Sequence, residues 1–265
     1  MLSNALEEMV SGFFIDCGFS VSKIAETDTE VPDLLVKAQD HWYLVEIKDK
    51  KTDQTLMELL ESSIPGERTL PLGKRNRLSG IIRKGVGQLE SYQGNGHQFN
   101  LLWFTLNEMT LEKLVLRDGE TSLSWVEDLT QRQLFSTLYG YVDVNCYASD
   151  GSFFETGCFY FCNSEFYRFQ QLHAVFIQTS KELILCVNDL SDRYADFCRS
   201  SLYQSLVQQG ILIVEPYKRE TENHCLLVDG DVDRNDIRTV SQYLMARYHL
   251  LHVRPYQYVL VNLPV

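Results

Sequence analysis

The chain has 265 residues, of which 45% are hydrophobic and 23% are charged, and its formal net charge is −12 at pH 7. This composition is that of a globular protein with a buried core, and the length suits one large domain or two smaller ones. The acidic charge argues against a protein that coats nucleic acid by bulk attraction, and the sequence has no run of about 20 apolar residues that would cross a membrane.

The first 110 residues alternate between helical and strand patterns. Apolar residues recur at helical spacing over residues 4–17, and Gly18 follows as a helix stop. Residues 49–80 are charged and irregular, so we expect a short helix and then a mobile loop. The other predicted elements are strands at Val21–Ile24, Val31–Val36 and Trp42–Lys48, a short helix at Thr55–Ser62, a helix over residues 81–93 and a strand at Leu101–Leu106.

The pattern stays mixed beyond residue 110. Strands are predicted at Leu114–Leu116, Tyr141–Tyr147, Ala174–Gln178, Leu183–Val187, Ile211–Val214, Cys225–Val228 and Tyr258–Val261, and helices at Glu127–Leu138, Ala195–Gln209 and Arg238–Tyr248. We therefore predict an α/β protein with a mixed sheet flanked by helices over residues 1–110 and an accessory α/β region over residues 111–265.

Charged groups interrupt the second strand of the predicted hairpin. Side chains alternate across a strand, so Glu46 and Lys48 share one face while Val45 and Ile47 point to the other. Asp33 begins the neighbouring strand and can meet Glu46 across the pair. An aspartate, a glutamate and a lysine are therefore expected to lie together on an otherwise apolar hairpin.

Two neighbouring carboxylates repel each other and favour a cation between them. Hard oxygen ligands suit Mg²⁺ or Mn²⁺, which polarise a phosphoryl oxygen and lower the pKa of bound water. The carbonyl oxygen of Ile47 can add another ligand. Lys48 can orient or deprotonate the water, or offset charge that builds on the phosphate. This set of groups is sufficient to hydrolyse a phosphodiester.

The segment VPDLLVKAQDHWYLVEIKDK resembles the signature of the PD-(D/E)xK, or restriction-endonuclease-like, nuclease superfamily. Pro32-Asp33 stands for PD, twelve residues separate Asp33 from Glu46, and Glu46-Ile47-Lys48 stands for ExK. Gln88 and Tyr92 match the QxxxY motif of the RecB-type branch and lie one helical turn apart. The resemblance covers residues 1–106 and implies a restriction-endonuclease-like core.

The resemblance also implies which residues act. The catalytic set would be Asp33, Glu46, Lys48, Gln88 and Tyr92, and the metal ligands Asp33, Glu46, the Ile47 carbonyl and Glu7. Glu7 is chosen over Glu8 because it falls beside the apolar stripe of the first helix, although a helix-capping role explains it equally well. A basic cluster is expected to contact the phosphate backbone and comprises Lys74, Arg75, Arg77, Arg83 and Lys84.

The expected function is Mg²⁺- or Mn²⁺-dependent hydrolysis of nucleic acid, with the preference for DNA coming from the resemblance alone. Such nucleases serve antiviral defence or DNA processing. The acidic charge suggests that a partner protein, a guide or a second copy of the chain brings the substrate in. The N-terminus reads as neither a secretory signal nor a transit peptide, and the seven cysteines form no CxxC motif, which favours a cytoplasmic protein with reduced thiols.

Two other interpretations remain open at this point. The chain can be a catalytically inactive module that keeps the nuclease fold for binding or regulation, or residues 111–265 can sense a ligand and gate the nuclease. The stretch Phe153–Phe169 holds eight aromatic residues. It can stack on bases, but a domain core or a dimer surface is the more ordinary explanation.

Overall fold

The structure of this chain is a computed structural model with side chains. It describes residues 2–25, 31–38, 41–50, 67–69, 77–92, 99–106, 133–179, 182–222, 224–256 and 259–261. Among these residues no helix combines the length and the apolar character that a bilayer crossing requires. The chain divides into two compact units, and each is built from several separate segments.

The first unit takes in Met1–Lys50, Arg77–Leu106 and Phe169–Glu215. Its helices are α1 (Leu2–Asp16), α3 (Arg77–Ser91), α6 (Tyr194–Arg199) and α7 (Ser201–Gln208). Its strands are β1 (Ser20–Lys23), β2 (Leu34–Lys37), β3 (Trp42–Lys50), β5 (Phe99–Leu106), β8 (Ala174–Gln178), β9 (Leu183–Val187) and β10 (Leu212–Val214).

Within the described residues these seven strands form one mixed sheet in the order β1-β2-β3-β5-β8-β9-β10. The strands β1, β2 and β3 form an antiparallel meander, while β5 lies parallel to β3 and β8 parallel to β5. The parallel step from β3 to β5 is crossed by α3, as a parallel connection requires. The central strand β5 is buried along its whole length, which explains why six of its eight residues are apolar.

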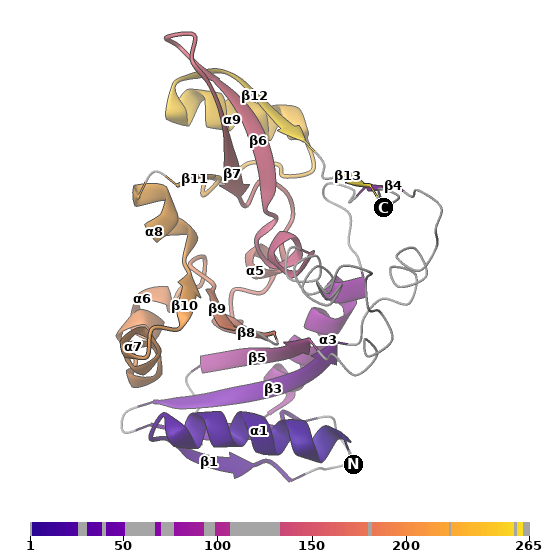
Figure 1. The fold of residues 1–265 in the computed structure, drawn as a ribbon, viewed down its shortest axis with the longest axis vertical. Helices are drawn as coiled ribbons and strands as arrows, with labels where there is room; N and C mark the ends of the chain where they lie inside the picture. The colour runs from indigo at the N-terminus through magenta and orange to yellow at the C-terminus, as the bar shows by residue number, and fades with distance from the viewer. Residues whose placement is uncertain are drawn as a thin grey trace, which may run out of the picture. The chain divides into compact units, whose positions relative to one another are not determined.

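Helices cover both faces of this sheet (Figure 1). Val10 and Phe14 of α1 and Leu202 and Leu206 of α7 belong to one buried cluster that also contains Trp103 of β5. Neighbouring side chains on the strands point to the opposite face, where α3 lies against β3 and β5. The predicted α/β class, with a mixed sheet between helices, is confirmed.

The predicted boundary at residue 110 does not coincide with the division of the structure. Strands β8, β9 and β10 were predicted, the first two with their observed bounds, yet they extend the sheet of the first unit instead of building a separate region. The predicted helix Ala195–Gln209 is two helices, because Ser200 is extended and its side chain caps the second one. The predicted strand Leu114–Leu116 and helix Thr55–Ser62 lie outside the described residues.

The second unit takes in Lys51–Asn76, Asn107–Arg168 and Pro216–Val265. Its named elements are β4 (Glu67–Thr69), β6 (Val142–Ala148), β7 (Phe153–Phe159), α5 (Glu165–Arg168), α8 (Pro216–Thr221), β11 (Cys225–Leu227), α9 (Ile237–Tyr248), β12 (Leu250–Tyr256) and β13 (Val259–Val261). Within the described residues a four-stranded sheet has the order β11-β7-β6-β12, and β4 pairs with β13.

Much of the aromatic stretch Phe153–Phe169 lies in the core of this unit. Phe159, Tyr160, Phe161 and Phe166 are buried, so the ordinary explanation holds for them. Phe153 is an exception, because half of its surface is exposed. The stretch also contains β7, which the sequence analysis did not predict as a strand.

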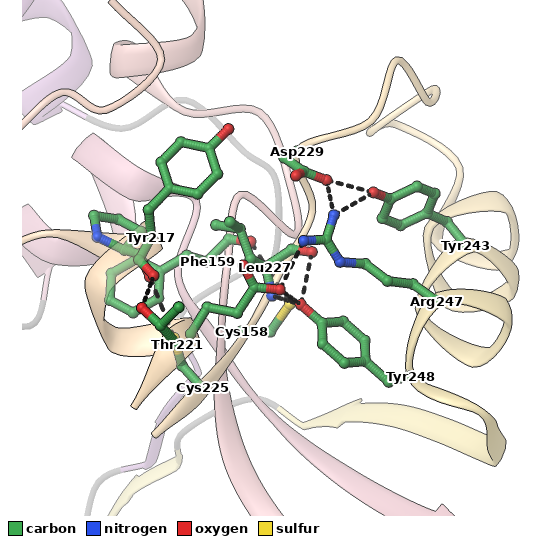
Figure 2. Close-up of polar contacts among 12 residues, drawn as sticks. Cys158, Phe159, Tyr217, Thr221, Cys225, Leu227, Asp229, Tyr243, Arg247 and Tyr248 are labelled. Atoms are coloured by element: carbon green, nitrogen blue, oxygen red, sulfur yellow. Dashed lines mark hydrogen bonds and ion pairs between the residues drawn. The ribbon is translucent and has the colours of Figure 1, made fainter. Parts of the chain in front are cut away.

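Arg247 joins three elements of the second unit. Its guanidinium forms ion pairs with Asp229 and with Glu220 of α8, the latter at 2.7 Å between Nη2 and Oε1. Figure 2 shows this guanidinium between Asp229 and the rings of Tyr243 and Tyr248. The Tyr248 hydroxyl accepts a hydrogen bond from the backbone N–H of Leu227 in β11 at 2.8 Å. The network ties α9 to α8 and to β11.

Asp236 begins α9 as its N-cap, accepting hydrogen bonds from the Arg238 N–H at 3.1 Å and from the Thr239 hydroxyl at 2.7 Å. The Asp236→Ala variant is expected to lose about 1 kcal/mol of unfolding free energy, because the first turn loses its acceptor. Urea denaturation measures this loss. Asp231→Ala removes an exposed carboxylate just upstream and should stay within about 0.5 kcal/mol of the wild type. Equal losses in the two variants would contradict the cap.

Candidate functional site

The hairpin of β2 and β3 sets the position of the predicted carboxylates. Leu34 lies opposite Val45 in the antiparallel register. The same register continued by one residue places Asp33 opposite Glu46, as the sequence analysis predicted. Directly opposed residues of an antiparallel pair point to the same face. Both carboxylates therefore lie on the face of the sheet that carries α3.

A backbone hydrogen bond holds Asp33 against the second strand. The N–H of Ile47 donates to Oδ2 of Asp33 at 2.7 Å. The N–H and C=O of one strand residue point to the same side of the strand. The Ile47 carbonyl, predicted as a ligand, is thus directed to the side on which Asp33 lies.

Lys48 connects the strand to α3. Its ammonium donates one hydrogen bond to Oε1 of Glu46 and another to Oε1 of Gln88, the latter at 2.6 Å. Gln88 comes from α3, 40 residues away in sequence. The structure therefore brings Asp33, Glu46, Lys48 and Gln88 together, four of the five residues that were predicted to be catalytic.

Glu46 is an acidic side chain in an apolar place. Only 2% of its surface is exposed, and no protein N–H or O–H donates to its buried Oε2, which only a proton shared with Asp33 or a bound cation would satisfy. Burial raises the pKa of Glu46 to about 7, with a further increase from the neighbouring Asp33 that Lys48 partly offsets. A carboxylate held in this way has an uncompensated oxygen, and an unpartnered buried acceptor costs free energy.

Asp33 shares this environment. Burial raises its pKa above the ordinary value, while the Ile47 N–H and the Lys48 ammonium act in the opposite direction. Glu7 also raises the pKa of Asp33, which places this α1 carboxylate within electrostatic reach of the pair. Glu7 forms an ion pair with Lys23 of β1 at 3.0 Å between Oε2 and Nζ.

The close approach of α3 to the site depends on Gly85. A Cβ atom at this position would lie 2.7 Å from Cδ2 of Leu102, 3.3 Å from Cε of Lys48 and 3.6 Å from Cγ of Glu46. One helical turn separates Gly85 from Gln88. A residue without a side chain thus lets the helix bring Gln88 to the Lys48 ammonium.

This geometry predicts different effects for two glycines of one helix. Gly87→Ala is expected to raise the unfolding free energy by about 0.5–1 kcal/mol, because alanine favours the helix and nothing lies within 4 Å of its Cβ. Gly85→Ala should instead lower it by about 1 kcal/mol through overpacking against Leu102 and Lys48. Paired urea denaturation curves measure both, and a gain at Gly85 equal to that at Gly87 would refute the close contact.

The remaining predicted residues are placed only in part. Arg83 and Lys84 are exposed on α3, and Lys84 lies one helical turn before Gln88. Arg77 begins α3, and Tyr92 lies just beyond its end, partly buried. Lys74 and Arg75 lie outside the described residues. Lys84 therefore lies on the same side of α3 as Gln88, with its side chain exposed.

The donor set suits a hard divalent cation. Asp33 and Glu46 offer carboxylate oxygens, the Ile47 carbonyl lies beside them, and the orphaned Oε2 of Glu46 is a buried acceptor that a cation would satisfy. Within the described residues no group of three or more His, Cys, Asp or Glu side chains is arranged to hold a metal by itself. A Mg²⁺ ion at this place would therefore keep several waters or take substrate oxygens, as this ion usually does.

Two residues of the site were missed by the sequence analysis. Lys23 was only part of a strand prediction, and its contact with Glu7 depends on the packing of α1 against β1. Gly85 was only part of a helix prediction. The three glycines of the segment Gly80–Gly87 were the available signal for a close approach, since glycine is unfavourable within a helix.

Three comparisons bear on the relationship of this chain to other proteins. No protein-family model matches the sequence, no curated protein matches it, and no solved structure matches the fold. The site therefore has to be interpreted from its own geometry.

Proposed function

We propose that the chain is a metal-dependent nuclease of the PD-(D/E)xK type, which hydrolyses phosphodiester bonds in DNA. One observation carries the proposal. Lys48 bridges Glu46 and Gln88, while the buried Glu46 lies against Asp33, so that the two carboxyl groups must either share a proton or bind a cation. A structural ion pair needs no second carboxylate beside it, whereas a cation site does.

The order of elements supports the same proposal. The core runs α1-β1-β2-β3-α3-β5, with the antiparallel meander before α3 and a parallel strand after it. The resemblance implies a helix before the sheet and another after the ExK strand. The proposed fold of the first unit is accordingly a restriction-endonuclease-like core to which β8, β9 and β10 are added.

The metal would be held by Asp33, Glu46 and the Ile47 carbonyl, with Glu7 within electrostatic reach of the pair. When bound, such an ion supplies Lewis-acid polarisation of the phosphoryl oxygen and lowers the pKa of water. The protein's own part is positional. The sheet holds both carboxylates at one point, and the hydrogen bond from Ile47 orients Asp33.

Lys48 has two roles open to its ammonium group. It is held by Glu46 and Gln88 at the position next to the carboxylates, where it can orient the attacking water or neutralise charge that develops on the phosphate. Gln88 restricts the direction of the ammonium through the 2.6 Å hydrogen bond. A lysine with fixed partners is already oriented before substrate arrives, which lowers the cost of reaching the transition state.

The substrate class follows from the surroundings of this site. Lys84 is exposed on α3 one helical turn from Gln88 and so offers a cation on the same side of the helix, whereas Arg83 is exposed on the opposite side. The chain as a whole is acidic, and the affinity for polyanions must therefore come from such local groups. The choice of DNA over RNA as the proposed substrate rests on the resemblance to the PD-(D/E)xK motif alone.

The test is a cleavage assay with purified full-length protein. Plasmid, linear and single-stranded DNA and a matched RNA are incubated with Mg²⁺ or Mn²⁺, with EDTA as the negative control. We expect cleavage of DNA that EDTA abolishes. Binding of DNA without cleavage under every metal condition would favour the inactive binding module over the nuclease.

A further inference from the structure

The four-stranded sheet of the second unit carries a row of aromatic rings on one face. Tyr147 of β6 lies opposite Phe153 of β7 and opposite His252 of β12. The ring centroids are 5.1 Å apart for Tyr147 and Phe153 and 6.2 Å apart for Tyr147 and His252. Directly opposed residues share a face, so the three rings form one continuous row across three strands.

This row is open to solvent. Phe153 is 51% exposed and Tyr147 is 44% exposed, and His252 is exposed as well. Cys146, the neighbour of Tyr147 in sequence, points to the other side of the sheet and is fully buried there. Grouped large apolar side chains at a protein surface mark an interaction site more often than isolated ones do.

A second row on the same face carries opposite charges at its two ends. Asn145 of β6 lies opposite Glu155 of β7 and opposite Arg254 of β12. Glu155 and Arg254 are both exposed. Neither forms an ion pair within the described part of the chain. One end of the row is therefore an available anion and the other an available cation.

We propose that this face, comprising Tyr147, Phe153, Glu155, His252 and Arg254, is a homodimer interface that binds a second copy of the chain. A two-fold axis parallel to β6 and midway between two facing sheets exchanges the β7 side with the β12 side. It places Glu155 of one copy over Arg254 of the other, twice, and Tyr147 over its own equivalent. The face is thus complementary to itself: charged side chains of one copy meet opposite charges of the other, and aromatic rings meet aromatic rings.

A nucleic acid fits this face less well. Aromatic rows can stack on bases, but such platforms are accompanied by an excess of cations that track the phosphates. Here Arg254 is balanced by Glu155, and the whole chain has a net charge of −12. The same balance is favourable between two copies of one surface, because each charge then meets its opposite.

The size of the face sets the expected strength. Three strands spaced by about 4.8 Å with two rows of side chains make a patch well below the roughly 800 Å² per partner of a standard interface. We therefore expect a weak dimer with a dissociation constant on the order of 10–100 µM. The proposal does not depend on the proposed nuclease function.

Sedimentation velocity of the full chain over a wide concentration range tests the dimer. We expect the wild type to pass from monomer to dimer, and Phe153→Ser to weaken dimerisation by roughly 30-fold. Ile237→Ser is the matched control, because Ile237 is 46% exposed and lies on α9 of the same unit. Circular dichroism and thermal melts verify that each variant folds.

Charge exchange tests the two-fold arrangement itself. Glu155→Arg alone and Arg254→Glu alone each set like charges opposite each other and should each remain monomeric. Mixing these two variants restores both opposite-charge contacts, so the mixture should form a heterodimer, and the double variant should dimerise with itself. Asp231→Arg is the control for a charge change away from this face and should dimerise as the wild type does.

Specific results would overturn the proposal. These are a wild-type chain that stays monomeric at about 1 mM, dimerisation that both single charge variants retain, or a mixture of them that fails to associate. Binding of a fluorescent oligothymidine by a monomeric wild type, lost in Phe153→Ser but kept in Ile237→Ser, would instead assign the face to single-stranded nucleic acid.

Discussion

The Glu46→Gln variant is expected to cleave DNA about 1,000-fold more slowly than the wild type in saturating Mn²⁺, as is Lys48→Met. Glutamine keeps the shape of the glutamate but removes the charge that a divalent cation needs. Methionine keeps the apolar stem of Lys48 but removes the ammonium that contacts Glu46 and Gln88. Single-turnover rates on a labelled duplex, measured with excess enzyme, report the chemical step directly.

Asp49→Asn provides the matched control for this loss. Asp49 lies on the same strand but alternates to the opposite face, and it is exposed. We expect its cleavage rate to stay within about threefold of the wild type. Near wild-type cleavage by both Glu46→Gln and Lys48→Met would remove the assigned site. Their inactivity would not by itself prove it, so circular dichroism must show that both variants fold.

The second large effect concerns stability and needs no substrate. The pKa of Glu46 rises from its ordinary value of 4.5 to about 7 in the folded chain, chiefly because of burial. The folded state thus binds this proton more tightly than the unfolded state does. The stabilisation from this bound proton is complete below about pH 4.5 and is lost as the pH rises through about 7. The unfolding free energy falls by about 3 kcal/mol over this range.

Glu46→Gln should abolish this dependence, because glutamine resembles the protonated glutamate and does not titrate. In EDTA at about pH 8 we expect the variant to be more stable than the wild type by about 2–3 kcal/mol, and near pH 4.5 the two should be equal. Thermal unfolding measured at several pH values gives the difference curve. A difference that does not change with pH would contradict the buried, ionising carboxylate.

Divalent cations add an independent check of the same site. At about pH 8 Mn²⁺ should raise the melting temperature of the wild type, since an ion that binds only the folded chain stabilises it. It should not raise that of Glu46→Gln. An increase of equal size in both proteins would show that the ion binds elsewhere. This readout distinguishes an empty cation site from a site that binds metal but does not cleave.

The local part of the site was predictable from sequence. Asp33 directly precedes β2, Glu46 lies on β3, and the two strands are close in sequence, so strand alternation and the antiparallel register set both residues on one face. The spacing of Glu46 and Lys48 on one strand is likewise a local property. To predict that Gln88 faces the site, the rotation of its helix must also be known, and the resemblance to the QxxxY motif supplied this information.

The long-range part was not predictable in the same way. β8 and β9 were predicted as strands, but their sequences do not indicate that β8 pairs with β5. β12 was missed because its run follows α9 after a single residue and contains Pro255, which ordinarily argues against a strand. That proline is tolerated because, among the described strands, β12 is at the edge of its sheet. A chain cut at the predicted boundary of residue 110 would accordingly lack β8, β9 and β10 of the first unit.

The order in which the segments of the first unit leave the ribosome has a consequence for the cell. The residues of the proposed site lie within the first 92 residues, but β8, which pairs with the free edge of β5, begins only at Ala174. Until that strand emerges, β5 exposes an unpaired apolar edge, the kind of surface that holdase chaperones bind and that favours aggregation. The nascent chain thus carries all the proposed catalytic groups long before it can complete the sheet that holds them.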